Sequence, residues 1–172
     1  SDIIPSQISY GVVQRVLQNL LEEAVTLRDM RSIIETIAEH APRTQDAVEL
    51  TAHVRVALGR SIVQQLYPGN ADLSVMALDP SLERVLLQAV QTVGPDGSGI
   101  EPGLADTLLR QTAAAAQRQE EVGLPAVLLV PGQLRWLLSR FLRRAVPQLK
   151  VIANAEVPDS RTIKVTAIIG GK

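Results

Sequence analysis

The spacing of apolar residues changes once along this chain of 172 residues, and the change separates two kinds of structure. Up to the turn at residues 67–70, apolar residues recur at helical spacing, which is typical of amphipathic helices. Beyond the turn, short apolar runs alternate with helical segments, which is typical of buried strands joined by helices. We therefore place a boundary near residues 67–72, and predict a helical subdomain over 1–69 and an α/β subdomain over 70–172.

The helical subdomain is predicted to hold three helices. The first carries apolar residues at helical spacing over 8–21. The second begins at Ser32, where the letters SIIE form a capping box, and stops before Pro42. The third starts after Thr44 and runs to about Gln65, where the letters YPGN signal a turn.

The α/β subdomain is predicted to follow the order β-α-α-β-α-β-β. Its first two strands are the apolar runs LSVMAL (73–78) and AVLLV (126–130). Between them lie one helix capped by Asp79, with Pro80 at its first position, and another that opens at EPGLAD and ends at Gly123. After a further helix, KVIANAEV and TIKVTAII flank a PDS turn and predict a terminal hairpin. The expected fold class is α+β with a small mixed sheet, since the long crossovers imply some parallel pairing.

Composition excludes several kinds of chemistry. Cysteine is absent, which removes thiol catalysis, thiolate metal sites and disulfides. No run approaches the roughly 18 apolar residues that span a bilayer, and no secretory signal pattern opens the chain. The chain as given is therefore expected to lie in an aqueous compartment. Because its first residue is serine and not methionine, we also expect it to be a piece of something longer.

Charge is unevenly distributed, although the formal net charge is only −1. Residues 126–172 hold 8 basic residues against Glu156 and Asp159, whereas residues 68–125 hold 3 arginines against 8 acidic residues. An acidic middle and a basic end can pair within one chain or between subunits. The basic end is therefore not by itself evidence of nucleic-acid binding.

The segment RWLLSRFLRRAVP (135–147) is the first candidate for a binding surface. Helical geometry gathers its leucines on one face, which we expect to contact the sheet, and its arginines on a solvated face. Trp136, the chain's only tryptophan, lies on the polar face. It can stack under Arg140 in a cation–π contact or be covered by a neighbouring subdomain or subunit, and the second alternative is favoured. The arginines are Arg135, Arg140, Arg143 and Arg144.

The segment LRDMR (27–31), between the first two helices, is the second candidate. Asp29 can simply favour the positive start of the following helix. Alternatively, Arg28, Asp29 and Arg31 form an ion-pair cluster that fixes a domain or subunit contact. Both interpretations stay open, because exposed ion pairs contribute little stability.

Catalytic and metal sites find little support. His40 and His53 have no partners at ligand spacing, and we expect His53 to pair locally with Glu49 and His40 to favour the end of its helix. GPDGSG (94–99) follows a helix and lacks the Gly-Lys-Ser/Thr element, so it is a connector and not a phosphate loop. No nucleophile motif is present. We predict no enzyme activity, no metal and no cofactor.

Several strings together carry a family resemblance: LLEEAVTLRDMRSIIETIAEHAP, ELTAHVRVALGRSIVQQL, LDPSLERVLLQ, EPGLADTLLRQT and VGLPAVLLVPGQLRWLLSRFLRRAVPQLKVIANAEVPD. They cover nearly the whole chain and resemble the C-terminal cytoplasmic region of the flagellar export-gate family (FHIPEP), which is shared with virulence-type type III secretion systems. The LDPSLE, EPGLAD and Phe-Leu-Arg-Arg segments favour the flagellar branch.

The resemblance implies a non-enzymatic docking and assembly part of a flagellar type III protein export gate. The parent would have an N-terminal half in the bacterial inner membrane, absent here, and a cytoplasmic part that forms a nonameric ring. That part would receive export substrates with their chaperones from the secretion ATPase complex, and meet other export-gate components. This chain would be the last two, cytoplasmic subdomains.

The resemblance also suggests roles for particular residues. Ring contacts in the family fall largely in the helical subdomain, so Arg28, Asp29 and Arg31 are candidate subunit contacts. Trp136 and Arg140 are candidate contacts between units. The chaperone groove belongs to upstream subdomains, so no chaperone-binding residue is expected here.

Two other classes remain as alternatives. One is a nucleic-acid-binding adaptor that uses the basic C-terminal third, for which salt-dependent retention on polyanions would be diagnostic. The other, weaker alternative is a hydrolase with an unrecognised site, which would show a strongly shifted side-chain pKa in a cleft. The export-gate interpretation expects no nucleic-acid partner.

Overall fold

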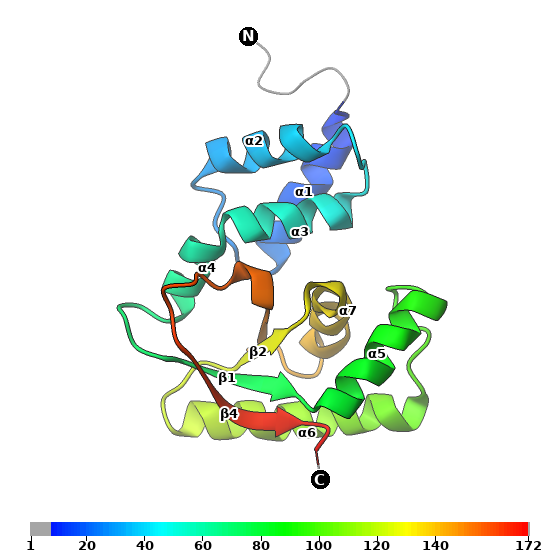
Figure 1. Cartoon of the computed structure of the whole chain (residues 1–172), viewed down its shortest axis with the longest axis vertical. Coiled ribbons are helices and arrows are strands. Elements are labelled where there is room, and N and C mark those ends of the chain that lie inside the picture. The colour runs from blue at the N-terminus through cyan, green and yellow to red at the C-terminus, as the bar shows by residue number, and fades with distance from the viewer. Residues whose placement is uncertain (1–7, 172) are drawn as a thin grey trace. The chain divides into compact units, whose positions relative to one another are not determined.

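The computed structural model describes residues 8–171 and divides into two compact units (Figure 1). Unit 1 is the chain up to Gln65 together with Glu156–Pro158, and unit 2 is Leu66–Ala155 together with the chain from Asp159 onward. The expectation drawn from the opening letters SDIIPSQ lies outside the described residues. Over the described range, seven α-helices and one four-stranded sheet confirm the α+β class.

Unit 1 is built from helices whose starts are fixed by side-chain caps. Ser9, Asp29 and Asp46 precede the first three helices, and each side chain accepts a hydrogen bond from a backbone N–H of the turn that follows. Their apolar faces supply fully buried side chains, among them Leu20 and Ile37. The helices are α1 (Tyr10–Glu22), α2 (Met30–His40), α3 (Ala47–Ala57) and α4 (Gly59–Leu66).

The prediction that the second helix begins at Ser32 is wrong. Asp29 is the N-cap of α2, since its Oδ1 accepts a hydrogen bond from the Ser32 N–H at 3.2 Å and its Oδ2 accepts one from the Ser32 hydroxyl at 2.7 Å. A carboxylate at this position both satisfies a free N–H and interacts favourably with the helix dipole. The alternative in which Asp29 favours the start of a helix therefore describes its local role.

The single third helix predicted after Thr44 is two helices, α3 and α4, separated at Leu58. A Cβ atom on Gly59 would collide with the backbone carbonyl of Glu156, which belongs to the same unit. The chain therefore needs a glycine where the Glu156 segment meets this break. The apolar periodicity continues across the break, so the sequence pattern alone does not reveal it.

Replacing Gly59 by alanine is expected to lower the free energy of unfolding by about 1–3 kcal/mol, the usual cost of overpacking. Gly103→Ala in α6 (Pro102–Glu121) is the matched control. There the Cβ would meet only the side chain of Glu101 at 3.6 Å, and alanine is the better helix former. Urea unfolding followed by circular dichroism measures both variants. Equal stabilities would argue against the close approach at Gly59.

The sheet of unit 2 is parallel throughout. Its strands are β1 (Leu73–Leu78), β2 (Val127–Val130), β3 (Lys150–Ala153) and β4 (Ile163–Ile169), in the spatial order β3-β2-β1-β4. Each neighbouring pair is parallel, with Val75 opposite Val165 in the β1–β4 pair. The predicted mixed sheet with a terminal hairpin is therefore wrong, because β3 and β4 lie at opposite edges.

The connection from β3 to β4 explains the error. After β3 the chain forms a short 3₁₀ helix, Asn154–Glu156, and residues Glu156–Pro158 belong to unit 1. On its return, Arg161 donates hydrogen bonds to the carbonyls of Tyr67 (3.1 Å) and Ala71 (2.9 Å), ahead of β1. These bonds place the start of β4 beside β1. The alternating apolar pattern and the turn motif of the sequence do not predict which strand β4 pairs with.

Three helices pack on one face of this sheet, since their buried side chains share one core cluster with residues of the strands. They are α5 (Pro80–Thr92), α6 (Pro102–Glu121) and α7 (Gly132–Arg143). Leu86 of α5, Leu108 of α6 and Leu138 of α7 are fully buried in one cluster with Met76 and Leu128 of the sheet. Over residues 8–171, no helix combines the length and the apolar character needed to cross a membrane.

Candidate docking surfaces

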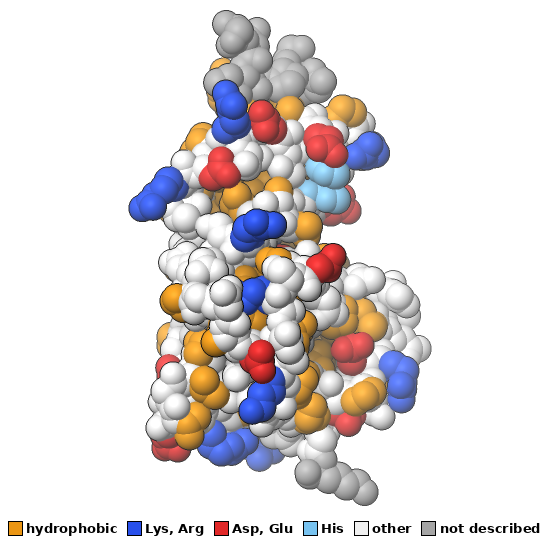
Figure 2. All heavy atoms as spheres, turned by 60° about the vertical axis from the view of Figure 1, so that its left-hand side comes forward, with side chains coloured by type: hydrophobic (Ala, Val, Ile, Leu, Met, Phe, Trp, Pro, Cys, Tyr) orange, Lys and Arg blue, Asp and Glu red, His pale blue; other side chains and the backbone are white. Residues whose placement is uncertain are grey.

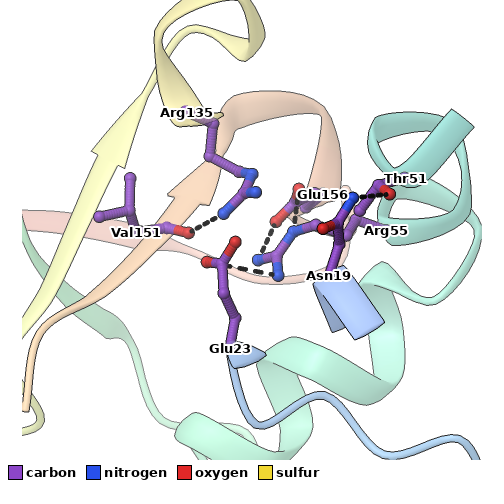
Figure 3. Close-up of polar contacts among 7 residues, drawn as sticks. All are labelled: Asn19, Glu23, Thr51, Arg55, Arg135, Val151 and Glu156. Carbon is purple, nitrogen blue, oxygen red and sulfur yellow. Dashed lines mark hydrogen bonds and ion pairs between the residues drawn. The ribbon is translucent and has the colours of Figure 1, made fainter. Parts of the chain in front are cut away.

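The prediction that all four arginines of the segment 135–147 lie on a solvated face is wrong for Arg135, which is buried. Its side chain is only 4% exposed, and its Nη1 donates a hydrogen bond to the Val151 carbonyl of β3 at 3.2 Å (Figure 3). A buried guanidinium needs such acceptors, because an unpaired buried charge is strongly unfavourable. Arg135 is therefore a structural residue of unit 2, and the remaining arginines form the polar face.

Trp136 and Arg140 form the cation–π contact that the sequence analysis gave as one of two alternatives. The guanidinium carbon of Arg140 lies 5.1 Å from the centroid of the indole ring, within the range of an attractive contact. Trp136 itself is half-buried within unit 2. Its coverage by a neighbouring unit or subunit stays a prediction.

Both residues line a groove of about 710 Å³ along α7, which we call the α7 groove. One wall is α7 with the residues that follow it, and the others are α6 and the loop after α5. Apolar and charged side chains share the surface. The lining residues are Pro95, Asp96, Leu109, Trp136, Leu137, Arg140, Phe141, Arg143, Arg144 and Ala145.

Asp96 is the single acidic residue among the lining residues. Its Oδ1 accepts hydrogen bonds from the Ser98 N–H at 2.9 Å and the Ser98 hydroxyl at 2.7 Å. These bonds lower the pKa of Asp96 below its ordinary value of 3.8, so the carboxylate is ionised at neutral pH. With three arginines and one carboxylate, the lining of the α7 groove is positively charged.

A second groove lies in unit 1, between the α1–α2 connection and α4, and we call it the α2–α4 groove. It consists of two adjoining depressions of about 410 and 540 Å³ that share Asp29, Leu58, Ser61 and Gln65. Hydrogen bonds from Ser32 lower the pKa of the exposed Asp29 carboxyl. The groove therefore carries an ionised carboxylate at its rim.

The structure brings only part of the LRDMR segment to this groove. Arg28 and Asp29 line it, and Arg31 is not among its lining residues. No ion pair joins Asp29 to Arg28 or Arg31 within the part of the chain that the structure describes. A cluster closed within this segment is therefore absent there. A role for the three residues between subunits stays a prediction.

The buried ion pair of Arg55 and Glu156 is a feature that the sequence analysis missed. Arg55 Nε lies 2.9 Å from Glu156 Oε2, and Arg55 Nη2 lies 3.0 Å from Glu156 Oε1. Figure 3 shows Glu23 on the other side of the guanidinium, with Oε1 at 3.9 Å from Nη1. Arg55 and Glu156 are 3% and 2% exposed. They lie in different predicted subdomains of the sequence, so no local spacing could reveal the pair.

The environment keeps Arg55 charged. Burial by itself lowers the pKa of Arg55, but the attraction of Glu156, its hydrogen bonds and the charge of Glu23 outweigh it, so that the pKa is raised. The bidentate geometry suits a planar guanidinium. This pair holds the Glu156–Pro158 segment within unit 1.

Removing one member of the pair is expected to destabilise unit 1 strongly. Glu156→Gln should lower the free energy of unfolding by about 3–5 kcal/mol, because it removes the bidentate counter-charge of a buried guanidinium and leaves only Glu23, at 3.9 Å. The triple variant Arg55→Met, Glu156→Leu, Glu23→Gln should lose much less, since it removes the guanidinium together with both carboxylates that face it and leaves no uncompensated charge. Chemical unfolding of the three chains measures this. A single variant that is as stable as the parent would overturn the assignment.

The two histidines stack on each other at the surface of unit 1. The ring centroids of His40 and His53 are 3.6 Å apart and the planes differ by 7°. The adjacent pale blue side chains in Figure 2 are this pair, since the chain has 2 histidines. The Arg43 guanidinium donates a hydrogen bond to His40 Nδ1 at 3.1 Å. The expected ion pair of His53 with Glu49 is absent among the described residues.

This environment lowers the pKa of His53 from its ordinary 6.5, first through burial and then through the charges of His40 and Arg43, against the opposing effect of Glu49 and Glu39. The unfolded chain therefore binds a proton more readily than the folded chain just below pH 6.5. Stability rises with pH through that window and falls on acidification.

The melting temperature is accordingly expected to fall more steeply between about pH 7 and pH 5.5 in the parent chain than in His53→Gln, which cannot take up this proton. Thermal unfolding over a pH series compares the two, and Gln45→Ala serves as a control for a polar change outside the stack. Identical pH profiles for the parent and His53→Gln would contradict a lowered pKa.

Taken together, the described residues form a scaffold whose prominent surface features are two grooves. Within residues 8–171, no group of three or more potential ligands could hold a metal ion.

Comparison with known proteins identifies the group of proteins. The profile of the FHIPEP family matches residues 1–162, and the chain belongs to that family. It is 57% identical over 171 residues to the flagellar biosynthesis protein FlhA of Salmonella typhimurium and 57% identical over 169 residues to that of Yersinia enterocolitica. These alignments cover 99% and 98% of this chain. The chain spans about a quarter of these relatives, 24% of each.

Solved structures share the fold. The MxiA protein of Shigella flexneri has a TM-score of 0.82 at 26% identity, over 95% of this chain and 52% of that one. The complex of the Chlamydia pneumoniae CdsV and CdsO proteins gives 0.81 at 24% identity, over 95% and 48%. Nonameric SctV-C from EPEC gives 0.73 at 23% identity, over 95% and 49%.

Proposed function

We propose that this chain is a non-enzymatic docking and assembly part of a flagellar type III protein export gate. The observation that carries the proposal is its 57% identity, over 99% of its length, to a flagellar biosynthesis protein FlhA. The fold likeness to MxiA, at 26% identity, supports the same class. The helical subdomain and the α/β subdomain would be the last two of the cytoplasmic region, in a parent anchored in the bacterial inner membrane.

Assembly into a ring is the first part of the proposal. The structure described as nonameric SctV-C shares the fold of this chain. We infer that the parent of this chain assembles in the same way and that Arg28, Asp29 and Arg31 contribute to the subunit contact. The exposure of all three side chains supports this, together with the two depressions beside Asp29, since an assembly contact needs accessible charge and shape.

Reception of cargo is the second part. The gate would receive export substrates with their chaperones from the secretion ATPase complex. A relative in fold, CdsV, has been captured in a complex with CdsO, which supports the use of this fold as a docking platform. Chaperone contacts are assigned to the part of the parent upstream of this chain, and no residue here is given that role.

The nucleic-acid adaptor is not favoured. Arg135 of the basic C-terminal third is engaged inside unit 2, and the positive α7 groove contains the ionised carboxylate of Asp96. A carboxylate repels a phosphate backbone, which binds through accumulated positive charge.

Charge reversal at Asp29 tests the assembly contact. In the full-length protein, Asp29→Arg is expected to reduce ring assembly at least about fivefold and to reduce motility in a strain that lacks its own gate protein, because a charge at a contact is inverted. Light scattering and electron microscopy measure assembly, and a swimming assay measures export.

Asp29→Asn is the matched control, because asparagine caps a helix as well as aspartate does. It separates the loss of charge from the loss of the cap. Ring assembly that is unchanged in Asp29→Arg would count against Asp29 as a subunit contact. Normal motility of a strain that lacks the protein altogether would overturn the export-gate function itself.

A further inference from the structure

We infer that the α7 groove is a docking site for a short acidic peptide segment of a partner protein, which inserts an apolar side chain beside Trp136 and sets its carboxylates against Arg140 and Arg144. The inference deepens the proposed function and rests on it only in treating the chain as a docking component. It assigns a binding site for an acidic peptide to unit 2, whereas the proposed ring contact lies in unit 1.

The positive wall of the groove follows from helical spacing. Trp136 and Arg140 are four residues apart, and Arg144 follows Arg140 at the same interval, so that the three side chains form a row along one side of α7 and its C-terminal cap. Arg140 and Arg144 are exposed. Neither forms an ion pair with a carboxylate in the described part of the chain. Two positive charges at the rim are thus available to a partner.

The floor of the groove supplies apolar anchorage. Trp136 and Phe141 are the chain's only tryptophan and only phenylalanine, and both line this groove. They are half-buried, as is Leu109 on the facing helix α6. Half-buried aromatic side chains in a recess are typical anchors for an inserted side chain. A volume of about 710 Å³ is enough for a few residues of peptide.

The opposite wall favours a peptide over a polyphosphate. Asp96 uses Oδ1 for both hydrogen bonds from Ser98, and the second oxygen of a carboxylate can accept a further hydrogen bond, such as one from a peptide N–H. The same negative charge repels phosphates. One face of the Trp136 ring is occupied by Arg140, which limits base stacking, the usual contact of single-stranded nucleic acids.

The unique tryptophan makes the groove directly observable. The purified chain would be titrated with a short capped peptide of alternating glutamate and leucine while the fluorescence of Trp136 is recorded. A matched peptide of lysine and leucine is the control. We expect a saturable change with the acidic peptide that weakens as salt is raised, and no saturable change with the basic peptide.

Matched variants locate the binding. The double variant Arg140→Gln, Arg144→Gln should raise the dissociation constant of the acidic peptide at least about fivefold, as expected for the loss of two partly exposed charge pairs. Arg84→Gln, Arg110→Gln is the control, because it removes two exposed arginines of α5 and α6 that do not line the groove. Phe141→Ala should also weaken binding of the acidic peptide, because it removes part of the apolar floor of the groove. Circular dichroism verifies that each variant is folded.

The inference would be overturned by equal binding of the two peptides, by binding that survives loss of both groove arginines, or by duplex DNA that binds more tightly than the acidic peptide and displaces it. A fluorescence change with protein concentration alone, abolished by the groove variant, would assign the groove to a second copy of this chain and overturn it too. If the acidic peptide does not bind while motility still depends on the full-length protein, the inference about the α7 groove is wrong and the proposed function stands. If peptide binding holds while the protein is dispensable for motility, the proposed function is lost instead.

Discussion

The buried ion pair of Arg55 and Glu156 is the constraint on which much of the chain's course depends. A carboxylate that is 2% exposed is tolerated only with a charged, well-oriented partner, and Arg55 supplies it through two short hydrogen bonds. Residues Glu156–Pro158 consequently belong to unit 1, although the strands before and after them belong to unit 2. The backbone of the same segment packs closely against Gly59 at the break between α3 and α4. The ion pair and this close backbone contact together fix the position of the segment within unit 1.

The path of this segment decides the topology of unit 2. Because the chain leaves the unit after Ala155 and returns at Asp159, β3 and β4 are not joined by a tight turn. Arg161 then bonds the carbonyls of Tyr67 and Ala71, and β4 adds to the edge beside β1. An entirely parallel sheet results, with one layer of helices over one face. The fold therefore depends on contacts between segments that are far apart in sequence.

The arginines of α7 show how one sequence pattern can serve two purposes. Arg135 is engaged with the backbone of β3 and stabilises the sheet, whereas Arg140 packs on Trp136 and remains exposed with Arg144. Only the exposed arginines offer charge to a partner. In unit 1, Asp29 likewise combines a local role as the cap of α2 with a place at the rim of the α2–α4 groove.

The sequence by itself determined the α+β class, the helix starts at Asp79 and Pro102 and the first two strands, because caps and apolar runs act between near neighbours. Helical spacing allowed the contact of Trp136 with Arg140 but did not select it over coverage of Trp136 by a neighbour. Family-specific strings pointed to the export-gate family. Only the tertiary structure decided the break at Gly59, the burial of Arg135, the edge to which β4 adds and the pairing of Arg55 with Glu156. Those features depend on which distant segments meet, and neither periodicity nor propensity carries that information.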